Sequence, residues 1–199
     1  MLTPDKLREL DAQFDKNFFT QEATLELLSL GVQTASKLKF ESSRVIWNTA
    51  CFVNILSYDL KVIVRAMMHS KREWEKRVYA RQGALLIYEA TNDLFELLGK
   101  SFRDIIATLP DKGSIEASLT EIRADLNSFK NMNFDKIKEI RHVAAAHRDQ
   151  DTLKLLQTIY SISWTDSFNI CSAFDKIVNK LGVVLQTLTA RVKELEALD

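Results

Sequence analysis

The stretch FDKIVNKLGVVLQTLTARVKEL, residues 174–195, decides the fold class, because its apolar residues return at alternating spacings of four and three. This spacing places them along one side of an α-helix as a heptad seam. The seam residues are Phe174, Val178, Leu181, Leu185, Leu188, Val192 and Leu195. Such a seam packs either inside a helical bundle or against a second copy of the chain. The sequence therefore predicts a long C-terminal helix that begins near Thr165.

Helical periodicity and capping signals continue through the rest of the chain. Thr3 and Pro4 suit the start of a short first helix, and Thr20 can cap a second helix that ends near residue 38. Further helices are expected over residues 42–69, 72–109, 114–130, 133–148 and 152–160, with a bend at Gly99 and breaks at LPDKG and NMNF. With only 5 Gly and 2 Pro in 199 residues, the composition favours an all-α helical bundle.

Composition and charge limit the classes of function. The 27 basic and 27 acidic residues give a formal net charge of zero, so any contact with nucleic acid or an anionic membrane must come from a local patch. Cys51 and Cys171 are far apart and show no metal-binding spacing, which indicates a reduced, cytoplasmic setting. The N-terminal sequence MLTPDKLREL lacks the apolar core of a signal peptide.

The most apolar segment is VIWNTACFVNILSY, residues 45–58, which carries no formal charge. Spanning a bilayer takes about 20 predominantly apolar residues, and this segment is shorter and is interrupted by Asn48 and Asn54. The sequence therefore predicts a buried core helix here and no interaction with a membrane.

The segment RHVAAAHRDQD, residues 141–151, contains two of the three histidines in the chain. On a helical wheel, His147 falls within an apolar arc, Arg141 and Arg148 lie at its edge, and His142 points away. A regular helix places Arg141 and His147 about 9 Å apart along the axis and about 120° apart around it. The two side chains therefore meet only if the helix ends or distorts near His147, if the arginine reaches along the groove, or if a second protomer contributes.

These residue types suit one kind of chemistry. Histidine side chains titrate near neutral pH, so an imidazole can take a proton from a ribose 2′-hydroxyl or give one to a leaving oxygen. A guanidinium can hold two phosphate oxygens and stabilise the charge that develops on them. Together, the two groups can cleave RNA without a metal.

The sequence EIRHVAAAHRD resembles the R-x(4–6)-H signature of the HEPN superfamily (higher eukaryotes and prokaryotes nucleotide-binding). Arg141 and His147 occupy its two fixed positions, His142 is the polar residue that follows the arginine, and AHRD is similar to a form seen in abortive-infection-type HEPN proteins. The resemblance implies a helical bundle that dimerises so that two motifs face each other. It also implies a metal-independent endoribonuclease that leaves a cyclic phosphate end, in a toxin–antitoxin or phage-defence setting with a protein antitoxin as partner.

In this interpretation Arg141 binds and stabilises the phosphate, His147 is the general acid or base, and His142 supports that role, without a cofactor. The chain is expected to form a single domain over residues 1–199. An HEPN-like core would span about residues 42–199, and residues 1–41 would form an N-terminal helical extension.

A second basic region lies between Lys61 and Arg81, with Trp74 and Tyr79 interleaved among its charges. It can track an RNA backbone, or it can be a solvated helical hinge. The RNA-binding candidates are Arg148, Lys71, Arg72, Lys76, Arg77 and Arg81. Polar residues of the following helix either line the same cleft as Arg141 or are ordinary surface; they are Glu89, Asn92 and Asp93.

The alternative hypothesis is a non-catalytic HEPN-like interaction or regulatory protein. In that case His147 is a core histidine, and Arg141 is a rim residue paired with an acidic neighbour such as Asp149 or Glu139. Glu139 and His142 also have the E-x-x-H spacing of di-iron bundles, but the chain lacks a second such pair, so no metal site is predicted.

Overall fold

The protein is an all-α helical bundle, as the sequence predicts. The computed structural model describes residues 3–145 and 150–196, and within these ranges it contains helices and no strand. The elements in chain order are α1 (Pro4–Leu38), α2 (Glu41–His69), α3 (Glu73–Leu97), α4 (Lys100–Thr108), α5 (Gly113–Ile140), the π-helical segment η1 (Arg141–Ala145), α6 (Thr152–Ser161), α7 (Trp164–Ala190) and α8 (Val192–Glu196).

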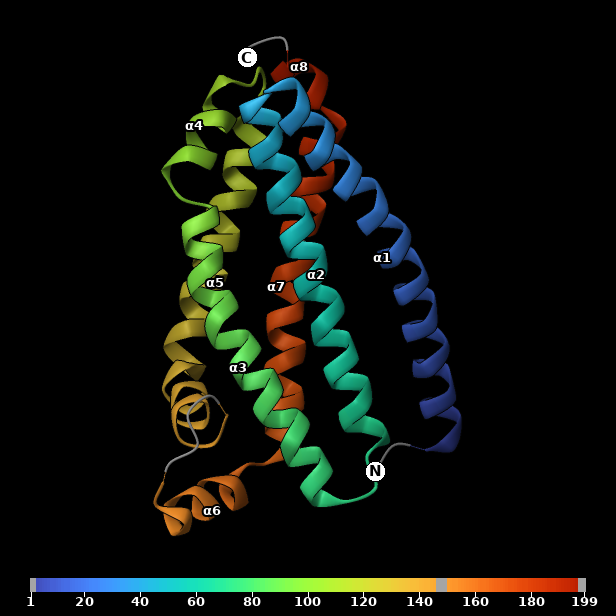
Figure 1. Cartoon of the computed structure of the whole chain (residues 1–199), viewed down its shortest axis with the longest axis vertical. Helices are drawn as coiled ribbons and strands as arrows, with labels where there is room; N and C mark the ends of the chain where they lie inside the picture. The colour runs from blue at the N-terminus through green and yellow to red at the C-terminus, as the bar shows by residue number, and fades with distance from the viewer. Residues whose placement is uncertain (1–2, 146–149, 197–199) are drawn as a thin grey trace.

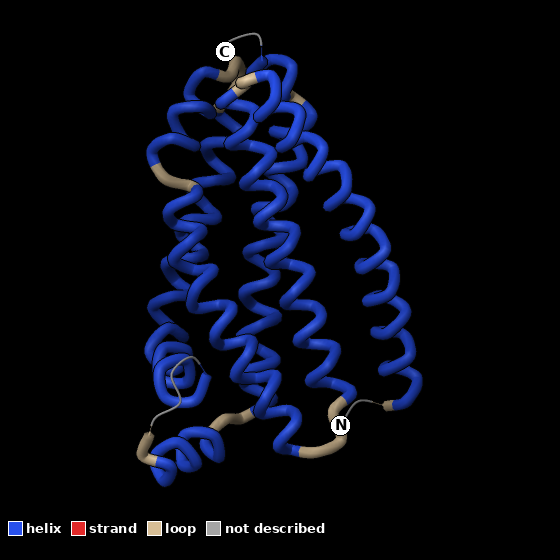
Figure 2. The backbone as a smooth tube through the Cα atoms, in the orientation of Figure 1, coloured by secondary structure: helices blue, strands red, loops and turns tan. Residues whose placement is uncertain are grey.

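The long helices α2, α3, α5 and α7 run side by side, and α7 packs against the other three (Figure 1). Helix α1 lies along the outside of α2 and forms one edge of the molecule. The short helices close the two ends, with α4 and α8 at one end and α6 at the other (Figure 2).

The heptad seam is buried inside this bundle, although the expected C-terminal helix is divided at Arg191 into α7 and α8. All seven predicted seam residues are buried, and Phe174, Leu188 and Leu195 have no exposed surface. The Phe174 ring lies 5.0 Å from the ring of Phe129 on α5, measured between centroids. Of the two expected partners for the seam, the structure therefore selects the other helices of the same chain.

The apolar segment at residues 45–58 is the core part of α2, which confirms the predicted buried helix. Its inward residues include Ile46, Val53 and Leu56, each exposed by at most 3%. Within residues 3–145 and 150–196, no helix has the length and apolar character needed to cross a membrane.

Two predicted helix breaks are wrong. Residues 4–38 form one continuous helix, and Thr20 does not cap a new one but donates its hydroxyl hydrogen to the Lys16 carbonyl, 3.0 Å away. The NMNF stretch also lies inside α5, where the Asn133 side chain donates to the Phe129 carbonyl at 3.0 Å. In both places a polar side chain satisfies a carbonyl one turn earlier in the helix, so the backbone continues.

The expected helix over residues 72–109 is two helices rather than one bent helix. Gly99 has an extended backbone, with φ −72° and ψ −156°, and it ends the helical run before α4 begins. The predicted break at LPDKG is confirmed, since α4 ends at Thr108 and Asp111 adopts a left-handed conformation. Thr3 caps α1 as expected by accepting a hydrogen bond from the Lys6 backbone.

The close packing of α1 on α2 depends on Gly31. A Cβ atom added there would lie 2.4 Å from Cδ2 of Trp47, whereas one added at Gly182 on α7 would have no neighbour within 4 Å. We therefore expect Gly31→Ala to lower the free energy of unfolding by about 1–3 kcal/mol through overpacking. Gly182→Ala should raise it by about 0.5–1 kcal/mol, because alanine favours the helix. Urea denaturation of both variants measures this, and equal effects at the two sites would contradict the packing argument.

Candidate functional site

The α5 helix changes to a π-helix where the RHVAAAHRD motif begins. The π segment covers Arg141–Ala145, and the buried Ala144 carbonyl accepts a hydrogen bond of 3.1 Å from Nη1 of Arg81 on α3. Such segments are rare, and they occur frequently at functional sites. Distortion near His147 is one condition for the predicted site, and the described helix is distorted over Arg141–Ala145. His147 and Arg148 themselves lie outside the described residues.

The Arg141 side chain is held by two residues of α3. Its Nε and Nη2 atoms donate to Oε1 of Glu89 at 3.0 Å and 2.7 Å. The guanidinium carbon also lies 5.0 Å from the centre of the Tyr88 ring, which is a cation–π contact. Arg141 is thus held by one carboxylate oxygen and one aromatic face, and both contacts restrict the directions in which it can point.

Aromatic and basic side chains continue from Arg141 along the surface between α3 and α5. Tyr88 stacks on Phe134 with ring centres 4.8 Å apart, and the ammonium of Lys130 lies 4.9 Å from the centre of the Phe134 ring. The exposed His142 ring meets Tyr88 edge-on at 6.0 Å. This surface therefore places two cations and a histidine beside a pair of stacked rings.

Of the three polar residues predicted to lie along the α3 face, only Glu89 reaches Arg141. Asn92 donates its side-chain amide to the Tyr88 carbonyl of its own helix. Asp93 lies beside a separate hollow of about 380 Å³ that Arg44 and Phe102 also line. Neither acidic neighbour proposed from the sequence, Glu139 or Asp149, is the partner that the structure shows for Arg141, and Asp149 lies outside the described residues.

The second basic region is divided by the fold. Lys71 and Arg72 are exposed at the turn between α2 and α3, whereas the other three candidates lie over aromatic rings. The distances from cation to ring centre are 4.5 Å for Lys76 over Trp164, 5.7 Å for Arg77 over Tyr160 and 5.9 Å for Arg81 over Trp74. Lys76 and Arg77 thus help to join α3 to α7 and α6, and Arg81 contacts the π segment.

Metal and cysteine chemistry find no support in the described residues. Within residues 3–145 and 150–196, no three His, Cys, Asp or Glu side chains gather in a way that could hold a metal ion. Burial raises the pKa of the Cys171 thiol to about 12, so this thiol does not supply a thiolate nucleophile at neutral pH.

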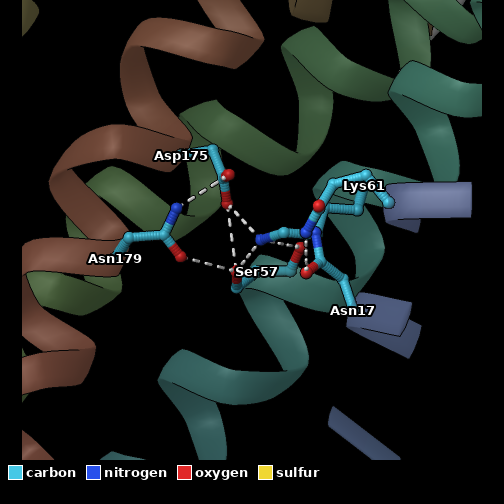
Figure 3. Close-up of polar contacts among 6 residues, drawn as sticks. Asn17, Ser57, Lys61, Asp175 and Asn179 are labelled. Carbon is cyan, nitrogen blue, oxygen red and sulfur yellow. Dashed lines mark hydrogen bonds and ion pairs between the residues drawn. The ribbon is translucent and has the colours of Figure 1, made fainter. Parts of the chain in front are cut away.

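A polar cluster that the sequence analysis did not identify lies between α2 and α7 (Figure 3). The Lys61 ammonium donates to Oγ of Ser57 at 2.5 Å and to Oδ1 of Asp175 at 2.9 Å. The Asn179 side chain donates to Oδ2 of Asp175 at 3.0 Å. Ser57 and Lys61 are four residues apart, a spacing visible in the sequence, but Asp175 is 114 residues from Lys61 and gives no local signal.

This cluster is better suited to holding helices together than to catalysis. A lysine must be neutral to act as a general base for a serine, whereas the ion pair between Lys61 and Asp175 uses the charged ammonium. The two side chains are only 12% and 21% exposed, so their charges compensate each other in a partly desolvated place. The cluster borders a groove of about 500 Å³ between α1, α2 and α7, which Asn17 and Gln21 also line.

The residues around Arg141 therefore form the candidate site, and the cluster around Lys61 connects α2 to α7. Comparison of the chain with protein-family models, curated proteins and solved structures found no match.

Proposed function

We propose that the chain is a metal-independent endoribonuclease of HEPN type that acts in a toxin–antitoxin or phage-defence setting. The observation that carries the proposal is the π-helical segment at Arg141–Ala145, with Arg141 held by Glu89 and Tyr88 beside the exposed His142. In this proposal two copies pair so that their motifs face each other, and a protein antitoxin restrains the activity.

The proposed reaction transfers one proton from the RNA to the protein and one proton from the protein to the RNA. A histidine takes the proton of the ribose 2′-hydroxyl, the 2′-oxygen attacks the adjacent phosphorus, and the bond from phosphorus to the 5′-oxygen breaks. A protonated histidine gives its proton to the leaving 5′-oxygen. The products are a 2′,3′-cyclic phosphate and a 5′-hydroxyl end. His147 carries the acid or base role, and His142 supports or shares it.

Arg141 is proposed to stabilise the charge that develops on the phosphate oxygens. The contacts to Glu89 use Nε and Nη2, and among the described residues no hydrogen bond occupies Nη1. A guanidinium that is already oriented loses less conformational freedom when it binds phosphate. The stacked rings of Tyr88 and Phe134, with Lys130 beside them, offer a surface for a base and a phosphate of the same strand.

Cleavage of transfer RNA by the purified chain in excess EDTA tests this proposal. We expect products with 2′,3′-cyclic phosphate ends, and we expect His147→Ala to lower the cleavage rate at least 100-fold, as the loss of a general acid or base does. Arg141→Ala should also lower the rate, whereas Arg123→Ala, an exposed arginine nearer the start of α5, should not. A wild-type rate no higher than that of His147→Ala would disprove the ribonuclease.

One observation favours the second candidate, a non-catalytic interaction or regulatory protein. Glu89 compensates the charge of Arg141, which is what a structural arginine at the edge of a core requires. In that case the wild-type chain leaves RNA intact, and Arg141→Ala lowers the free energy of unfolding by about 1 kcal/mol, the value of a partly exposed ion pair. The cleavage assay therefore separates the two candidates, and thermal unfolding measures what the ion pair between Arg141 and Glu89 contributes to stability in either case.

A further inference from the structure

One side of α1 is apolar and faces away from the bundle. Four of its large residues are exposed, with exposed fractions of 54–78%: Phe19, Leu27, Leu30 and Leu38. At about 100° per residue they fall within an arc of about 100°, and the exposed Ala23 and Thr34 fill the gaps between them. The exposed Thr20 and Lys37 lie at the two edges of this arc. We call Phe19, Ala23, Leu27, Leu30, Thr34 and Leu38 the α1 stripe. Away from the stripe, Leu28 and Ala35 of the same helix are buried. Helix α1 packs against α2 (Figure 1).

The length of the α1 stripe sets it apart from the other exposed apolar residues. Phe19 and Leu38 are 19 residues apart, so the stripe extends for about 28 Å along one helix. On the other described helices, large exposed residues occur singly, as Met132 on α5, or as two on one face, as Ile55 and Val62 on α2, and none forms a row of four. Contiguous apolar surface of this extent marks an interaction site on a soluble protein.

The spacing of residues within the stripe is compatible with a second copy of the same helix as the partner. Leu27 and Leu30 lie at equal distances on either side of the midpoint between Leu28 and Ser29. Phe19 and Leu38 are also equally distant from that midpoint, and so are Ala23 and Thr34. When two identical helices pack antiparallel about a two-fold axis, each residue faces the one at the mirrored position. We propose that the α1 stripe binds the α1 stripe of a second copy of this chain, with the two helices antiparallel.

Charges beside the stripe agree with this orientation. In the antiparallel pair, Lys37 of one copy lies at nearly the same height along the helix axis as Glu22 of the other copy, with an offset of about 3 Å. Glu22 already accepts a hydrogen bond from the Tyr58 hydroxyl, which holds its carboxylate in place. A parallel pair in register would instead set Lys37 against Lys37, and like charges at such a position destabilise the contact.

The size of the stripe fits a dimer that dissociates on dilution. A strip about 28 Å long and one helix wide buries on the order of 1,000 Å² across two copies, which is the lower end for specific interfaces. The α1 pair is a different contact from the motif-to-motif pair of the proposed ribonuclease, because α1 lies on the opposite side of the bundle from α5 (Figure 1). A dimer through α1 alone would leave the two Arg141 residues facing away from each other, so the proposed ribonuclease requires its own, second contact between copies.

Sedimentation velocity of the full chain over a concentration series tests the association. We expect the wild type to shift from monomer to dimer with concentration, and the Leu27→Glu/Leu30→Glu variant to associate at least tenfold more weakly. The matched control is Leu153→Glu, since Leu153 is exposed to 67% but lies on α6. A wild type that stays monomeric at high micromolar concentration, or a mass unaffected by the double substitution, would overturn the proposal. Far-UV circular dichroism checks that the variants remain folded.

Disulfide trapping tests the antiparallel orientation. Phe19→Cys and Leu38→Cys, mixed and oxidised, should form the mixed disulfide, because these positions face each other across the two-fold axis. Phe19→Cys alone should not cross-link with itself, since its two copies would lie about 28 Å apart. The unmodified chain controls for Cys51, which is half-buried, and Cys171, which is buried. Cross-linking of Phe19→Cys with itself would overturn the antiparallel pair.

Discussion

Replacing Phe174 by alanine should lower the free energy of unfolding by about 3–5 kcal/mol, the largest effect expected from a single change in this protein. Phe174 has no exposed surface, and its helix α7 packs against α2, α3 and α5. Its ring also packs on Phe129. The truncation therefore loses the free energy gained by burying a ring away from water, and it also loses a specific aromatic pair. Chemical denaturation with a two-state analysis gives the free energy of unfolding of the variant and of the wild type.

The matched comparison is Val183→Ala, which lies on the same helix with its side chain 64% exposed. That change should alter the free energy of unfolding by about 0.5 kcal/mol or less, because surface substitutions away from the core have small effects. A loss below about 1 kcal/mol for Phe174→Ala would show that α7 does not occupy the centre of the bundle.

The second large effect is expected at the cluster that joins α2 to α7. Lys61→Ala removes the cation that lies 2.9 Å from Asp175 and leaves that carboxylate in a place where its side chain is only 21% exposed. Removing one partner of a buried ion pair costs about 3–5 kcal/mol. Because both side chains retain some exposure, we expect about 2–3 kcal/mol, measured as a reduction in the free energy of unfolding.

A double variant separates the ion pair from the packing around it. Lys61→Met/Asp175→Leu removes both charges and keeps apolar volume, so it should be more stable than Lys61→Ala, since no charge remains without a partner. If instead the double variant loses as much stability as the two single changes added together, the pair is not coupled, and the cluster contributes through its separate side chains.

The parts of the fold that could be predicted from sequence are those in which each helix carries its own periodic signal. The seam from Phe174 to Leu195 is such a case, because burial at every third or fourth position follows from the pitch of the helix alone. The apolar segment at residues 45–58 is another, since a run without charge has to be covered by other elements. In both, the information lies within a few turns of the chain.

The wrong predictions came from signals that have two physical outcomes. Thr20 can cap a new helix, but it can also bond a carbonyl one turn back, and here it does the latter. Asn133 behaves in the same way inside α5. The buried positions Leu126, Phe129 and Ile137 continue along α5 on both sides of the NMNF stretch, so packing against the bundle outweighs the weak local preference for a turn.

The candidate site was found from sequence only in its local part. Arg141 and His142 belong to a motif that can be read along one helix, whereas Glu89 is 52 residues away and Tyr88 reaches the arginine only through the packing of α3 on α5. The Lys61 cluster shows the same limit, since Asp175 comes from the far end of the chain. A single sequence contains no signal for such pairings, because they depend on how the helices pack.

The π-helical segment makes the motif depend on the number of its residues as well as on their identity. A π turn accommodates one more residue than an α turn, so the side chains within Arg141–Ala145 are turned relative to a regular continuation of α5. Removing one residue between Arg141 and Ala145 would restore α-helical register and turn Ala145 by about 100° around the axis. The number of residues in this segment therefore sets where the Ala144 carbonyl lies relative to Arg81.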